Sequence, residues 1–205
     1  MPRFLFLVPL LVPLPALSED DSHPVIACFG DSLTAGFGVD AGLSYPDFLA
    51  KRLQERGYRY RVVNLGISGD TTTGGLARIQ SVLQLKPAIT ILELGGNDGL
   101  RGVPLTATRS NLESIIRQLM AARSRVILAG MTLPPNYGPD YIREFEQIYV
   151  QLAAKYRLPR IPFLLAGVAL NNQLMQADGI HPNAAGNEKV AATVWKTLEP
   201  LLRRR

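Results

Sequence analysis

The chain contains only two histidines, which restricts the acid–base chemistry that it can perform near neutral pH. A serine hydroxyl is a poor nucleophile at neutral pH, and it needs a neighbouring base, usually a histidine that a third group holds in place. His23 lies near the N-terminus in a segment that we expect to be flexible, where a base could not be held still. If the chain has a histidine-based site, His181 is therefore its base almost by elimination.

A carboxylate accompanies this histidine. Asp178 precedes His181 by three residues, and Gly179 between them allows the chain to curl back so that the carboxylate meets a ring nitrogen. Such a contact fixes the tautomer of the imidazole and stabilises the imidazolium that forms during catalysis. Pro182 favours an extended backbone at His181, which suits a loop. Taken alone, the segment is more typical of a surface loop that Asp178 merely shapes, and the motifs described next favour the catalytic interpretation.

Ser32 is the candidate nucleophile, in a Gly-Asp-Ser-Leu sequence that directly follows an apolar run. The oxyanion formed in acyl transfer needs preorganised donors, and the loss of one typically costs about 10²–10³ in rate. The candidate donors are the backbone N–H groups of Ser32 and Gly69 and the side-chain amide of Asn97. Each residue type also occurs in ordinary turns. Their placement after successive apolar stretches favours a shared oxyanion site.

The elements that must position these residues alternate along the chain. Short apolar strands are predicted at 25–29, 60–64, 88–94, 125–129 and, more weakly, 161–164; amphipathic helices are predicted at 44–56, 76–85, 106–122, 141–156 and 183–202. Strands separated by helices pair in parallel, with helices on both faces of one sheet. The fold class is therefore α/β, a three-layer α/β/α sandwich with a flavodoxin-like parallel sheet of about five strands. Ligands gather at the carboxyl ends of such strands, where the glycine-rich and polar loops converge.

Four motifs resemble, in order and spacing, the blocks of the GDSL or SGNH hydrolases, and the resemblance covers nearly the whole chain after its first segment. They are Gly30–Leu33, Ser68–Asp70, Gly96–Asp98 and Asp178–His181. The resemblance is closest to the small bacterial periplasmic thioesterase, lysophospholipase and arylesterase-type enzymes.

This resemblance implies a role for each of the five residues. Ser32 would be the nucleophile, Asp178 and His181 would complete a catalytic triad, and Gly69 and Asn97 would form the oxyanion hole with the Ser32 N–H. It implies no cofactor and no metal ion.

The leading hypothesis is hydrolysis of a carboxylic ester or thioester through an acyl-serine intermediate. Apolar residues in the connecting loops predict a groove for an acyl chain: Leu100, Val103, Leu133, Pro134 and Tyr137. One alternative is a carbohydrate deacetylase on the same scaffold. The other is a non-catalytic module that holds an anion in the loop at 68–73, as flavodoxin-like folds bind phosphate. Such a module needs neither Asp178 nor His181.

The composition excludes several classes of function. A chain of 205 residues has room for one substantial core, so we expect a single domain. The formal net charge is +5, but no basic stretch is interleaved with aromatic residues, which argues against nucleic-acid binding. One cysteine and two histidines do not suffice for a structural zinc site, which needs about four clustered ligands. We expect a monomer whose partner is a small-molecule substrate, with at most peripheral contact with lipid.

The N-terminal segment predicts export. Arg3 precedes an apolar run at 4–17, and small residues at 16–18 suit a signal peptidase. Residues 1–18 are therefore predicted to be a signal peptide and residues 19–205 the single hydrolase domain, in the periplasm or outside the cell. The alternative is an uncleaved N-terminal anchor. A lipoprotein-type cleavage before Cys28 is rejected because it would remove the strand that leads to Ser32.

Other polar residues are predicted to be structural. Asp31 and Asp98 adjoin site residues and should brace their turns. Glu93 shares a strand face with Ile89 and Ile91, which predicts a buried, hydrogen-bonded carboxyl group rather than a general acid. Core positions are predicted for Cys28 and for three apolar residues of the last helix: Val194, Trp195 and Leu198.

Overall fold

One parallel sheet forms the centre of the computed structural model, which describes residues 23–204. Its five strands lie in the order β2-β1-β3-β4-β5. They are β1 (Val25–Gly30), β2 (Arg61–Gly66), β3 (Ile89–Glu93), β4 (Arg125–Ala129) and β5 (Arg160–Ile161). The α/β prediction with a parallel sheet of about five strands is confirmed.

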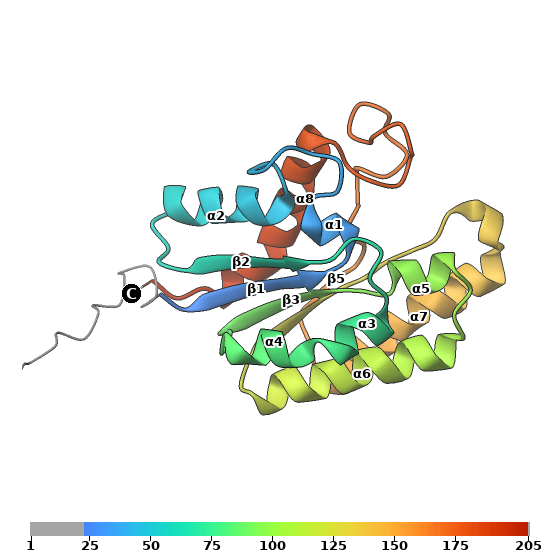
Figure 1. Ribbon diagram of the computed structural model, residues 1–205, viewed down its shortest axis with the longest axis horizontal. Helices are drawn as coiled ribbons and strands as arrows, with labels where there is room; N and C mark the ends of the chain where they lie inside the picture. Colours follow the sequence, from blue (N-terminus) through green and yellow to red (C-terminus); the bar gives the residue numbers. More distant parts are fainter. Residues whose placement is uncertain (1–22, 205) are drawn as a thin grey trace, which may run out of the picture.

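Helices cover both faces of this sheet. Figure 1 shows α2 and α8 on one face and α3, α4, α6 and α7 on the other. The helices are α1 (Ser32–Ala35), α2 (Tyr45–Glu55), α3 (Thr72–Ala77), α4 (Ile79–Gln84), α5 (Gly96–Leu100), α6 (Leu105–Ala121), α7 (Pro139–Tyr156) and α8 (Ala184–Leu198), with 3₁₀ turns at Pro135–Tyr137 and Glu199–Leu201. None of the helices in residues 23–204 is long and apolar enough to cross a membrane. The predicted signal peptide, residues 1–18, lies outside the described residues.

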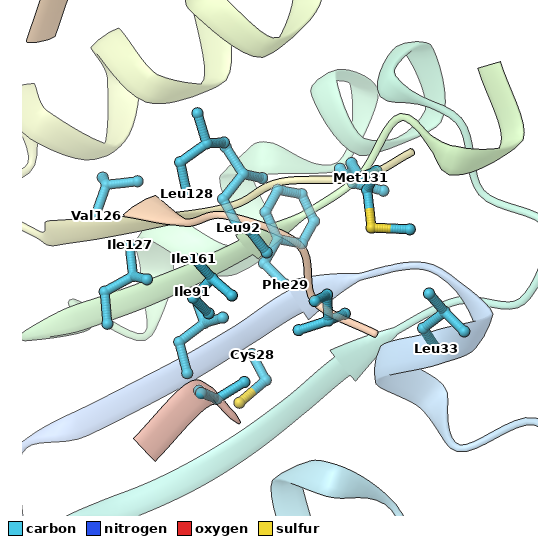
Figure 2. Close-up of a cluster of buried hydrophobic side chains, with 14 of the residues drawn as sticks. Cys28, Phe29, Leu33, Ile91, Leu92, Val126, Ile127, Leu128, Met131 and Ile161 are labelled. Carbon is cyan, nitrogen blue, oxygen red and sulfur yellow. The ribbon is translucent and has the colours of Figure 1, made fainter. Parts of the chain in front are cut away.

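The core forms on both sides of the sheet because neighbouring strands are in register. Cys28 pairs with Ile91, and Phe29 pairs with Leu92. Successive side chains of a strand point to opposite faces, so the members of each pair lie on the same face, as Figure 2 shows for these residues. All six residues of β1 are buried, as an apolar strand covered on both faces requires. Cys28 is a core residue, as predicted, and so are the three apolar residues of α8.

The structure corrects the predicted elements at four places. The helix predicted at 76–85 is two short helices, α3 and α4, which meet at Arg78. The loop expected after β3 forms α5. The last strand is shorter than the predicted 161–164 because Pro162 has no N–H to donate to a ladder. The final helix gives way after Leu198 to a 3₁₀ turn that contains Pro200.

Arg78 lies at the break between α3 and α4, and its side chain binds the carboxyl edge of the sheet. Its guanidinium donates to the carbonyl oxygens of Leu65 and Gly30 at 2.8 and 2.9 Å, and to Asp70 Oδ2 at 2.7 Å. It also lies over the ring of Phe29, 4.5 Å from the centroid. One side chain thus ties the ends of β1 and β2 to the loop that carries Asp70.

We predict that Arg78→Met lowers the free energy of unfolding by about 2–4 kcal/mol, because it leaves two carbonyls and a carboxylate without their donor. Urea denaturation measures this loss. Arg143→Met is the matched control, since Arg143 forms an exposed ion pair with Asp140 that contributes less than about 1 kcal/mol. Equal losses in the free energy of unfolding would show that Arg78 does not hold the ends of β1 and β2 to the Asp70 loop.

Candidate active site

Ser32 lies at the first turn after β1, where the chain bends sharply into α1. Asp31 caps this helix, since its Oδ1 accepts a hydrogen bond from the backbone N–H of Leu33 at 3.0 Å. The bend requires glycine at position 30, because a Cβ there would collide with Thr34 Oγ1 and with the Glu93 side chain. The backbone therefore holds the Ser32 side chain at the carboxyl edge of the central strand.

Ser32, His181 and Asp178 form a continuous line of hydrogen bonds. Ser32 Oγ lies 2.9 Å from His181 Nε2, and His181 Nδ1 lies 2.6 Å from Asp178 Oδ2. The other carboxylate oxygen of Asp178 accepts the backbone N–H groups of Ile180 and His181 at 2.9 and 3.0 Å. This curl is possible because Gly179 has a φ of +67°, which glycine adopts readily. The structure thus brings together the three residues that the sequence selects for a triad.

The surroundings of the histidine keep its partner charged. Burial tends to raise the pKa of Asp178, but the hydrogen bonds from His181 and Ile180 outweigh it and lower the pKa to about 2. The ring of Phe37 packs on the imidazole with 4.6 Å between centroids. His181 is therefore held from one side by a carboxylate and from another by an aromatic ring. The second histidine, His23, lies before the amino end of β1, at the opposite edge of the sheet from Ser32.

Gly69 and Asn97 lie at the same edge, after β2 and β3. The side-chain amide of Asn97 donates to Asp31 Oδ2 at 3.1 Å and to the Asp70 carbonyl at 3.0 Å. Asn97 therefore joins the loops that follow β1 and β2. Arg101 approaches its amide oxygen at 3.4 Å. The expected convergence of three loops is present.

The two aspartates next to site residues are braces, as predicted. Asp98 accepts hydrogen bonds from the Thr72 N–H at 2.8 Å and the Thr72 hydroxyl at 2.5 Å, which ties α5 to α3. Asp31 caps α1 and holds Asn97. Within residues 23–204, no three histidine, cysteine, aspartate or glutamate side chains gather in a way that could hold a metal ion.

Sequence reasoning missed Phe37 and Arg78. An aromatic residue between Gly36 and Gly38 was the available signal for Phe37, since such a loop rarely exposes a large apolar ring without reason. Arg78 gave no signal, because two of its three partners are backbone carbonyls that the spacing of residues does not reveal.

A pair of buried carboxyl groups lies beneath Ser32. Burial raises the pKa of Asp31 to about 6, although hydrogen bonds from Leu33, Glu93 and Asn97 oppose this shift. Burial and the neighbouring Asp31 charge raise the pKa of Glu93 well above its ordinary value. As pH rises, the unfolded chain loses the Asp31 proton at a lower pH than the folded chain does. The free energy of unfolding therefore falls between about pH 4 and about pH 6.

Asp31→Asn should therefore gain stability relative to the wild type as pH rises from about 4.5 to about 7.5, by on the order of 1–3 kcal/mol, because the variant has no charge to bury. Urea denaturation at the two pH values measures this change, and any constant effect of the amide cancels. Asp140→Asn is the control, since Asp140 is exposed and should show no such trend. A difference between wild type and Asp31→Asn that does not vary with pH would contradict the prediction.

Known proteins resemble the chain over most of its length. The profile of the GDSL-like lipase/acylhydrolase family matches residues 28–189. Esterase TesA of Pseudomonas aeruginosa is 44% identical over 91% of this chain and 93% of its own. Thioesterase 1/protease 1/lysophospholipase L1 of Escherichia coli K12 is 40% identical over 97% of this chain and 92% of its own. A crystal structure of TesA superposes with a TM-score of 0.84 at 46% identity, over 87% of this chain and 99% of that chain.

Proposed function

The chain belongs to the GDSL-like lipase/acylhydrolase family and is an esterase, and we propose that it cleaves carboxylic esters or thioesters through an acyl-enzyme on Ser32. The observation that carries this proposal is the hydrogen-bonded line from Ser32 Oγ through His181 to Asp178, at 2.9 and 2.6 Å. These distances are within the range that proton transfer requires.

The reaction has two halves, the acylation of Ser32 and the hydrolysis of the acyl-enzyme. His181 Nε2 removes the Ser32 hydroxyl proton as Oγ attacks the substrate carbonyl, and the imidazolium then protonates the leaving alcohol or thiol as its bond breaks. A water molecule next loses a proton to His181 and attacks the acyl carbonyl, and His181 returns a proton to Ser32 as the acid departs. The Asp178 carboxylate stabilises the imidazolium in both halves.

The oxyanion in each half would be met by the N–H groups of Ser32 and Gly69 and by the Asn97 amide. Both amide hydrogens of Asn97 have acceptors in the structure, Asp31 and the Asp70 carbonyl. The oxyanion, which carries a full charge, competes well with the neutral Asp70 carbonyl. We therefore assign to the oxyanion the hydrogen that Asp70 accepts in the resting site.

The apolar side chains around the site, which we call its rim, favour a substrate with an acyl chain of medium or long length. Three large apolar side chains next to site residues are about half exposed: Phe37, Ile67 and Ile180. On the other side, Tyr137 donates to the Leu100 carbonyl at 2.9 Å, which joins two of the loops predicted to form an acyl groove. This apolar rim favours an acyl chain over a carbohydrate, although a more distant relative, 28% identical, is named acetylxylan esterase. An anion-binding module would not need the contact between His181 and Ser32.

The sequence of the N-terminal segment supports export of the protein. The positive residue Arg3, the apolar run at 4–17 and the small residues after it fit a signal peptide at 1–18. We propose that this segment directs residues 19–205, one monomeric domain, to the periplasm or beyond the cell.

The triad is tested with a fluorophosphonate probe and a p-nitrophenyl ester. Ser32→Ala should abolish labelling, and His181→Ala should lower kcat by about 10³-fold or more, because the nucleophile loses its base. His23→Ala is the matched control and should leave kcat unchanged, since it lies at the other edge of the sheet. Labelling of folded Ser32→Ala at the wild-type rate would reject the proposed nucleophile.

The rim is tested with p-nitrophenyl esters of increasing chain length. Ile67→Ala should lower kcat/KM for a decanoate ester by about tenfold while leaving the acetate ester nearly unchanged, because only a long chain reaches the lost apolar surface. Met120→Ala is the control, since Met120 is similarly exposed but lies at the far end of α6, near the amino end of β4. Equal losses for acetate and decanoate would contradict an acyl-binding role for Ile67.

A further inference from the structure

Glu93, the last residue of β3, is fully buried directly behind the turn that carries Ser32. Its Oε2 accepts two hydrogen bonds, from the backbone N–H of Asp31 at 3.1 Å and from the Thr34 hydroxyl at 2.8 Å. Its Oε1 is buried and has no hydrogen-bond partner in the part of the chain that the structure describes. The mechanism described above uses neither oxygen.

This arrangement fits a neutral carboxylic acid. A charged carboxylate needs donors at both oxygens, and a bare charged oxygen in the interior is costly. In a neutral acid, Oε2 is the carbonyl oxygen that accepts two bonds, and an unpartnered Oε1 hydroxyl costs far less to bury than an unpartnered charged oxygen.

The groups that face Glu93 provide no counter-charge. Tyr45 from α2 and Tyr149 from α7 are buried and their pKa values are raised well above the ordinary value, so they stay neutral. Burial likewise raises the pKa of Cys28 in β1 to about 12. A carboxyl group, that of Asp31 before α1, also acts on Glu93. Asp31 donates its backbone N–H to Glu93 Oε2, and the charge of its carboxylate is a further cause of the raised pKa of Glu93.

Asp31 connects this acid to the oxyanion site. Its carboxylate accepts from Leu33 at 3.0 Å through Oδ1 and from the Asn97 amide at 3.1 Å through Oδ2. One hydrogen of the Asn97 amide is therefore fixed by a charged acceptor, and the second is held only by the neutral Asp70 carbonyl. The orientation of the amide plane depends on where the Asp31 carboxylate is held.

We propose that Glu93 is a positioning residue, which as a neutral acid accepts the backbone N–H of Asp31 and thereby fixes Asp31 and the amide of Asn97, so that the second hydrogen of this amide meets the oxyanion. This inference rests on the proposed function of Asn97. The two carboxyl groups carry one negative charge between them, and the proton on Glu93 keeps a second charge away from the oxyanion. Glu93 touches no reacting atom and acts only through Asp31 and Asn97.

A double-mutant cycle tests whether Glu93 acts through Asn97. Glu93→Leu should lower kcat about 10- to 100-fold with little change in KM, and Glu93→Gln should stay within about threefold of wild type because its amide oxygen also accepts from the Asp31 N–H and the Thr34 hydroxyl. In an Asn97→Ala background, Glu93→Leu should have no further effect on kcat, since the residue through which it acts is gone. Multiplicative losses, or a Glu93→Gln variant as poor as Glu93→Leu, would overturn the proposal.

A spectroscopic measurement tests the proton itself and does not depend on how Glu93→Leu folds. In protein labelled with ¹³C at the glutamate carboxyl, the Glu93 resonance, identified by its absence from Glu93→Gln, should keep the chemical shift of a neutral acid between about pH 5 and 8. The shift of a charged carboxylate at neutral pH would overturn the proposal. Fluorophosphonate labelling of the wild type separates this proposal from the proposed function. If Ser32 is not labelled, the proposed esterase mechanism is rejected. If Ser32 is labelled but the losses in kcat multiply in the double-mutant cycle, only the role of Glu93 is rejected.

Discussion

Parallel pairing of β1 with both β2 and β3 is the constraint on which the site depends. Gly30, the last residue of β1, is in register with Gly66 on one side and with Glu93 on the other. Three strands therefore end at one level, and the loops that follow them start side by side. Ser32, Gly69 and Asn97 each need only a short, well-anchored turn to reach the same place. A slip of one residue in either ladder would turn the side chains of that strand to the opposite face.

Polar side chains at this edge hold the loops in place. Arg78 ties the ends of β1 and β2 to Asp70, and Asn97 ties Asp70 to Asp31. Most of these partners are backbone carbonyls or carboxyl groups that would be unsatisfied without the contact. The edge thus carries buried charge and desolvated carboxyl groups that an apolar core would avoid. This is the usual balance in enzymes, where a preorganised site reduces stability and the rest of the core offsets the loss.

The sequence predicted the fold well because the fold follows from local patterns. Unbroken apolar runs mark the buried strands, and apolar residues at helical spacing mark α2, α6 and α7. The candidate triad was identifiable for a different reason, since only one histidine lies in a segment that can hold it. What the sequence did not reveal depends on tertiary contacts: the break at Arg78 and the neutral partner of Asp31 are set by atoms from distant segments. Glu93 was predicted to be buried and hydrogen-bonded, which the structure confirms, but its connection to Asn97 requires the register of β1 and β3.

Ser32 and His181 are separated by 149 positions along the chain, yet their side chains are in contact. Nearly the whole domain lies between them, and β1 has no neighbours until the segments that form β2 and β3 have been made. In a growing chain, Ser32 is therefore made long before its partner, and the contact between Ser32 and His181 forms only after the last segment has packed against the sheet.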